Sequence, residues 1–182
     1  MTILGVVGPK STIGETNRMN DVPESMRGEL QRWNAGNGID LEGWAGCSGT
    51  FSLAVGYTTV FWPKFERNGK YILRAGIPEA SIQGFESQAG STPASVEAVL
   101  NHLHLSSIQY AGCEDVSSDK LVLLGETLRE IYMAKLAWQF PDSACEVDLN
   151  LPDDKDDLWE YRITFWQKKW QIGASDTEPR TS

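Results

Sequence analysis

Two short stretches of the sequence carry residues suited to nucleophilic catalysis. Gly46-Cys47-Ser48-Gly49 places a thiol among small residues that would let a substrate approach. His102 and His104 are the only histidines in the chain, and either one is a candidate base for Cys47. We expect a helix from about residue 49, and a thiol at a helix N-terminus gains thiolate character. The alternative is a glycine-rich turn around a small buried thiol, because free cysteines are commonly buried.

The two histidines are also candidate metal ligands. In Asn101-His102-Leu103-His104 they stand two residues apart, which puts them on different sides of a helix but on one face of an extended segment. The chain has no His-x-x-x-His or Glu-x-x-His spacing, and metal sites normally show clusters of ligands. We therefore favour a histidine that packs or caps a helix C-terminus, and we expect no metal and no cofactor.

Asp153-Asp154-Lys155-Asp156-Asp157 concentrates four carboxylates in a turn-like loop. A calcium-binding EF-hand loop would need a central glycine and a distant glutamate, and this run lacks that glycine. Two interpretations remain, a solvated turn and an acidic contact surface for a basic partner. A second loop, Gly5 to Thr12, has the wrong spacing for a phosphate-binding loop, and Pro9 removes one of its amides.

Aromatic residues gather close to the acidic loop. Trp159, Trp166 and Trp170 lie there with Tyr161 and Phe165. Tryptophan is enriched at binding hot spots and is equally a normal core residue. Strand alternation from Trp159 puts Trp166 on the face opposite Tyr161 and Phe165. Either a second packed layer or a partner must then cover that face.

Net charge narrows the classes of partner. The chain has 25 acidic and 16 basic residues among 182, a net charge of −9. Such a protein repels DNA and RNA unless it has a basic patch, and the densest basic run is Lys168-Lys169. We expect a protein partner, basic in charge, with no nucleic acid and no membrane.

The cysteines and the hydropathy pattern suggest a compartment. Cys47, Cys113 and Cys145 are odd in number and widely spaced, which disfavours a disulfide framework or a zinc site. Reduced thiols are typical of the cytosol. No stretch approaches the ~20 apolar residues that span a bilayer, and the first residues lack the features of a signal peptide. We expect a cytoplasmic protein.

The patterning predicts helices and strands in mixture. A short helix is expected over 24–34. The apolar run before Pro63 fits either a strand or a helix, and its length and near-continuous apolarity favour a buried helix from about residue 49. Further expectations are a strand over 70–74, a short helix within 78–90, and a helix capped by Thr92-Pro93. The strongest helix runs from Ser117 or Ser118 to about Gln139. Its apolar face comprises Leu121, Leu124, Leu128, Ile131 and Trp138.

Alternation of apolar and polar residues in 145–151 and 159–168 predicts a C-terminal β-hairpin around the acidic loop. A lone hairpin is marginal in water, so it must join a larger sheet or pack on helices. The fold class expected is α+β, a single domain with several helices packed on a small, mainly antiparallel sheet. We expect a flexible N-terminal arm over 1–23, one domain over 24–172 and a polar tail over 173–182.

The functional interpretation rests on the acidic balance, the acidic loop and the aromatic residues beside it. They favour a non-enzymatic protein-interaction module of the immunity or antitoxin type, which neutralises a basic bacterial partner. The expected contact residues are Asp153, Asp154, Asp156, Asp157, Trp159 and Trp166. The alternative is a small cysteine- or histidine-dependent enzyme that uses Cys47 with His102 or His104.

Overall fold

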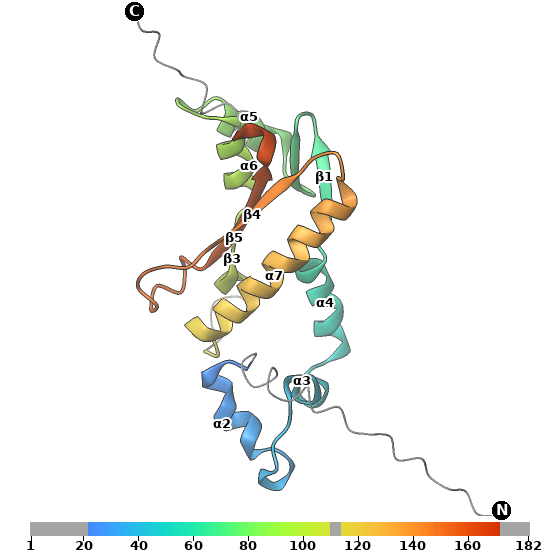
Figure 1. Ribbon diagram of the computed structural model, residues 1–182, viewed down its shortest axis with the longest axis vertical. Coiled ribbons are helices and arrows are strands. Elements are labelled where there is room, and N and C mark those ends of the chain that lie inside the picture. The colour runs from blue at the N-terminus through green and yellow to red at the C-terminus, as the bar shows by residue number, and fades with distance from the viewer. Residues whose placement is uncertain (1–21, 110–113, 172–182) are drawn as a thin grey trace, which may run out of the picture. The chain divides into compact units, whose positions relative to one another are not determined.

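The computed structural model of the protein describes residues 22–109 and 114–171. Its internal contacts divide the chain into two compact units, Met1–Cys47 and Ser48–Ser182. The second unit contains two small antiparallel sheets and most of the helices (Figure 1). The expected α+β class, with several helices and a small antiparallel sheet, is confirmed.

In the first unit, the described residues form helix α2 (Glu24–Arg32), the 3-10 turn η1 (Asn34–Gly36) and nearly all of α3 (Leu41–Ser48). The predicted helix over 24–34 is confirmed, and Leu30 is its buried residue. The chain then reverses through positive φ angles at residues 34–36, and Gly36, at 88°, adopts such an angle without a Cβ clash. The Trp44 indole joins the two helices by donating to Glu29 Oε1 at 2.8 Å.

The apolar run that the sequence left ambiguous forms helix α4 (Phe51–Phe61), as favoured. The Thr50 hydroxyl caps it by accepting from the Leu53 amide at 3.2 Å. The expectation that this helix is buried is wrong, because α4 has no buried residue. Phe51 and Val55 are 92% and 67% exposed.

A two-stranded sheet follows. Strands β1 (Phe65–Asn68) and β2 (Tyr71–Arg74) pair antiparallel through a tight turn at Gly69. Helix α5 (Glu79–Glu86) and helix α6 (Pro93–Asn101) come next, in the two places where the sequence predicts helices. At α6, Thr92 and Ser95 cap each other's backbone amides and Pro93 opens the first turn, as the Thr-Pro pair predicts.

The second sheet has three antiparallel strands in the order β3-β5-β4. Strand β3 (Leu103–His104) leads into the 3-10 turn η2 (Leu105–Ile108), and β5 (Arg162–Gln167) leads into η3 (Lys168–Trp170). Strand β4 (Cys145–Asn150) pairs with β5 from Cys145↔Gln167 to Asn150↔Arg162. The hairpin is therefore confirmed, although its second strand begins at residue 162 rather than 159.

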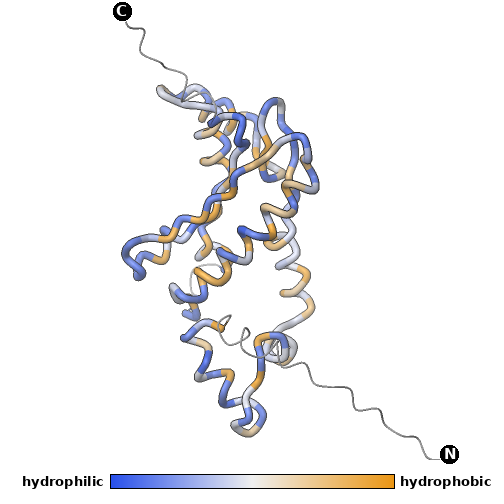
Figure 2. The backbone as a smooth tube through the Cα atoms, in the orientation of Figure 1, coloured by the Kyte–Doolittle hydropathy of each residue, from blue (hydrophilic) through white to orange (hydrophobic). Residues whose placement is uncertain are grey.

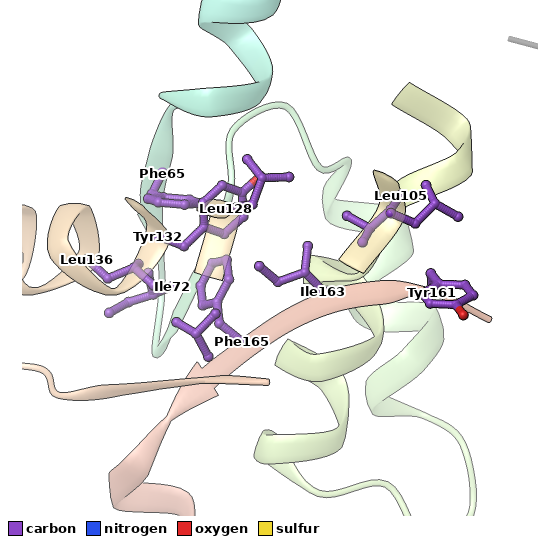
Figure 3. Packing of buried hydrophobic residues seen from close by; sticks show 11 residues of the cluster. Phe65, Ile72, Leu105, Leu128, Tyr132, Leu136, Tyr161, Ile163 and Phe165 are labelled. Atoms are coloured by element: carbon purple, nitrogen blue, oxygen red, sulfur yellow. The ribbon is translucent and has the colours of Figure 1, made fainter. Parts of the chain in front are cut away.

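Helix α7 (Ser118–Gln139) packs against β4 and supplies much of the core. Leu121 and Leu128 are buried as expected, whereas Leu124 and Ile131 are half-buried at the edge of the core. Trp138 does not belong to the buried face, because 73% of it is exposed. Figure 3 shows the rings of Phe65, Tyr132 and Phe165 packed together.

Side chains of α6 join the two sheets where no backbone ladder does. The Glu97 carboxyl group is fully buried and accepts from the amides of Ile72 on β2 and Gln167 on β5, both at 2.7 Å. Its second oxygen also accepts from the Trp170 indole at 2.9 Å. One turn later, Asn101 donates to the carbonyls of Ile72 and Phe165. These two side chains therefore provide hydrogen-bond partners for buried backbone amide and carbonyl groups of β2 and β5.

None of the helices within residues 22–109 and 114–171 combines the length and the apolarity that crossing a bilayer requires.

Candidate functional site

The connection between β4 and β5 is an ordered acidic loop. Asp153, Asp154, Asp156 and Asp157 are all exposed, and Figure 2 shows the hydrophilic tip of this hairpin. Successive turns close the loop, with Asp157 N–H donating to Asp154 O at 3.1 Å and Glu160 N–H to Asp157 O at 3.1 Å. Together with Lys155, the five residues carry a formal charge of −3.

Buried side chains at the base hold this loop in place. Tyr161 is 2% exposed, and its hydroxyl donates to the carbonyl of Lys155 at 3.3 Å. The Asn150 amide, at the end of β4, donates to the carbonyl of Glu160 at 2.7 Å. The backbone is thus tied at two points to the core sheet. Four carboxylates are presented on a backbone that is already ordered, which reduces the entropy lost on binding.

Trp159 stands at the end of the acidic loop and is 57% exposed. Its indole stacks on the ring of His104, with centroids 3.9 Å apart and planes 20° from parallel. The Nδ1 of His104 lies 2.7 Å from the carbonyl oxygen of Trp159. A carbonyl only accepts, so Nδ1 carries the proton in this bond. His104 therefore fixes both the backbone and the indole of Trp159.

His102 joins the same group. It follows α6 in an extended conformation (φ −68°, ψ 145°), and β3 continues through His104. The two rings lie edge to face with centroids 5.0 Å apart. The Nδ1 of His102 is held by the carbonyl of Val99, in the last turn of α6. The extended alternative is therefore the one that forms over residues 102–104, and His102 meets the end of α6 as a helix-capping histidine would.

We call Asp153–Asp157, Trp159, His102 and His104 the acidic aromatic surface. The acidic loop and the histidines were separate candidates in the sequence, and antiparallel pairing of β3 with β5 brings them together through His104↔Arg162. His104 and Trp159 are 55 positions apart, so no local pattern signals their contact. Arg162 forms an ion pair with Glu160 at 2.6 Å. The positive charge of Arg162 is therefore matched by Glu160 and not by an aspartate of the loop.

Trp166 lies apart from Trp159 along the sheet. It is half-buried on β5, opposite Glu146 on β4, and its side chain alternates with the buried Phe165 as expected. Trp166 lies four positions further along β5 than Arg162, which is about 13 Å at the usual rise per residue. The role of Trp166 in partner binding stays a prediction.

Cys47 does not occupy the helix N-terminus that its activation requires. It is exposed and lies in the last turn of α3, while α4 begins after Thr50. The expectation of a thiol activated by a helix N-terminus is therefore wrong. Cys47 belongs to the first unit and both histidines to the second, so their pairing stays a prediction.

Cys145 is not a strong alternative nucleophile. Cys145 is half-buried at the start of β4, and burial, followed by the negative charge of Glu97, raises the pKa of its thiol to about 11. Such a thiol stays protonated at neutral pH and is a poor nucleophile. Cys113, like the Gly5 to Thr12 loop, lies outside the described residues.

A second exposed aromatic group lies between α4 and α7. Trp62 and Trp138 are 50% and 73% exposed, with ring centroids 6.3 Å apart. The ammonium of the buried Lys135 sits 4.4 Å from the centre of the Trp62 ring, and burial lowers the pKa of this lysine. A shallow cavity of about 340 Å³ adjoins Trp62. It is lined by Thr58, Thr59, Trp62, Pro63, Lys64, Arg74 and Ala75.

Within the part of the chain that the structure describes, no group of three His, Cys, Asp or Glu side chains is arranged to hold one metal ion. Comparison of the chain with protein-family models, with curated proteins and with solved structures finds no match.

Proposed function

We propose that this protein is a non-enzymatic interaction module that binds a basic protein through its acidic aromatic surface. In this proposal it acts in the cytoplasm as an immunity- or antitoxin-like protein that neutralises a basic bacterial partner. Neither a nucleic acid nor a membrane is expected to bind the acidic loop, because both present negative charge.

The single observation that carries the proposal is the environment of Trp159. A large aromatic side chain is 57% exposed, yet it is held in place by the ring of His104 and by a hydrogen bond to its own carbonyl. An exposed tryptophan that is already ordered loses little entropy on binding, which is the property of an anchoring hot-spot residue.

The aspartates supply the second element of recognition. Four exposed carboxylates lie within the six residues that precede this tryptophan, on the hydrogen-bonded loop. Such a cluster attracts a basic surface over a Debye length, which is ~30 Å at 0.01 M salt and ~8 Å at 0.15 M. The charges of the loop aspartates therefore raise the association rate. The contact that Trp159 buries once the complex has formed slows dissociation.

The test is a capture experiment with matched baits, followed by kinetics on the captured protein. One bait carries Asp153→Asn and Asp157→Asn. Its control carries Glu126→Gln and Glu130→Gln, which removes the same charge from exposed positions on α7. A second bait carries Trp159→Ala, and its control carries Trp138→Ala, which removes a still more exposed tryptophan elsewhere.

We expect one basic protein to be captured by the wild-type chain and by both controls. The aspartate variant should mainly lower the on-rate and weaken its dependence on salt, and the Trp159 variant should mainly raise the off-rate. The proposal fails if the captured partner is acidic, if its on-rate does not depend on salt, or if the control variants lose as much binding as the loop variants.

A further inference from the structure

The imidazole rings of His102 and His104 lie next to each other. Both residues are extended, so their side chains project from the same face of the chain. His102 is exposed and His104 is half-buried. The two ring centroids are 5.0 Å apart.

This separation matches that of two imidazoles on one metal ion. A Zn–N bond is about 2.1 Å and the ring centre lies about 1.2 Å beyond the nitrogen, so two imidazoles on a tetrahedral ion have centroids about 5 Å apart. The planes of the rings, 88° from each other, are compatible with this because each ring can turn about its own metal–nitrogen bond.

The protonation pattern also suits a metal. Each Nδ1 is held by a backbone carbonyl, that of Val99 for His102 and that of Trp159 for His104. Because a carbonyl only accepts, each Nδ1 carries the ring proton, and in the neutral imidazole each Nε2 keeps its lone pair. A second nitrogen bonded to a backbone carbonyl is the usual support of a metal-binding histidine.

We infer that His102 and His104 bind one transition-metal ion of the zinc, nickel or copper class through their Nε2 atoms. Imidazole suits these ions, whereas calcium and magnesium prefer oxygen ligands. Water fills the remaining positions, since no third ligand is in place among the described residues. The neighbouring aspartates of the acidic loop raise the local concentration of cations without serving as ligands. This site does not depend on the proposed partner.

The experiment follows histidine side-chain nitrogens by NMR in the full-length, untagged, ¹⁵N-labelled protein as Zn²⁺ is added. The chain contains two histidines, so a single variant assigns both sets of signals. We expect the two Nε2 signals to shift together and to saturate at one ion per chain. Ca²⁺ should leave them unchanged. Replacing His102 with Ala leaves the stack of His104 on Trp159, and it should weaken Zn²⁺ binding by roughly tenfold or more, because the second ligand no longer adds its local effective concentration.

A second variant separates the histidines from the loop. With all four loop aspartates changed to Asn, the two Nε2 signals should still shift together. The inference is overturned if Zn²⁺ leaves either Nε2 signal in place in the wild-type protein, if His102→Ala binds the ion as tightly as the wild type, or if the aspartate variant abolishes the shifts.

Discussion

The ring of His104 lies flat against the indole of Trp159, with 3.9 Å between centroids, and its Nδ1–H donates to the carbonyl of the same tryptophan. One side chain of β3 thus orders an exposed tryptophan that follows the acidic loop.

Replacing His104 with Ala should loosen Trp159 without unfolding the protein, because His104 is only half-buried. We expect acrylamide to quench more of the tryptophan fluorescence in this variant than in the wild type. The difference should vanish when both proteins also carry Trp159→Phe. If quenching is the same with and without His104, the stack does not restrain the indole.

Leu128→Ala should reduce the free energy of unfolding by about 2–5 kcal/mol. Leu128 is fully buried, on the face of α7 that meets the core. Urea denaturation measures the change. Met133→Ala on the same helix is the control, because Met133 is 50% exposed and should shift the midpoint far less. Equal effects of the two substitutions would contradict the burial of Leu128.

Gly125→Ala should destabilise the protein by about 1–3 kcal/mol, although alanine has the higher helix propensity. Gly125 is buried on α7, and an added Cβ would lie 2.7 Å from the Leu149 side chain and 2.8 Å from the Leu105 side chain. Gly28→Ala in α2 is the matched control, because a Cβ there meets no atom within 4 Å. The control should be neutral or stabilising in the same denaturation experiment.

Glu97→Gln should reduce the free energy of unfolding by about 2–4 kcal/mol. The Glu97 carboxylate accepts hydrogen bonds from two backbone amides and an indole, and in the variant an NH2 group, which cannot accept, replaces one of its oxygens. Glu126→Gln makes the same chemical change on an exposed part of α7 and should lie within about 0.5 kcal/mol of the wild type. Hydrogen exchange adds a local measurement. The amides of Ile72 and Gln167 should lose protection in the Glu97 variant and keep it in the control.

Cys145 should make the free energy of unfolding depend on pH in the alkaline range. Burial raises the pKa of this thiol from 9.0 to about 11, so the folded state holds its proton more tightly than the unfolded state does. The stabilising contribution is complete below about pH 9 and is lost as the pH rises through 11. We therefore expect the wild type to lose stability relative to Cys145→Ala over this range. Parallel curves for the two proteins would contradict the assignment.

Local structure could be predicted where neighbouring residues decide it. Thr92 and Pro93 begin α6, and the alternation in 145–151 marks β4, because caps and strand periodicity act over a few residues. Cys47 could not be placed from the same kind of pattern. Its glycine-rich surroundings fit both the start of one helix and the end of another, and only the full chain selected the end of α3.

The degree of burial was harder to predict than the type of element. The apolarity of α4 indicated a buried helix, yet Phe51 is 92% exposed. Glu97 shows the opposite case, a charged residue type that is fully buried because it accepts hydrogen bonds from strands on either side. Burial depends on which elements meet, and that depends on contacts far apart in sequence.

The sequence by itself determined the acidic balance, the mixture of helices and antiparallel strands, and the four aspartates of the hairpin loop, because composition and short-range periodicity are local properties. Only the tertiary structure decided that His102 and His104 lie beside that loop and that His104 holds Trp159. The physical reason is the pairing of β3 with β5, which joins Leu103 to Ile163 and His104 to Arg162, residues 60 and 58 positions apart in the sequence. Backbone hydrogen bonds between distant strands leave no mark on the residues near either one.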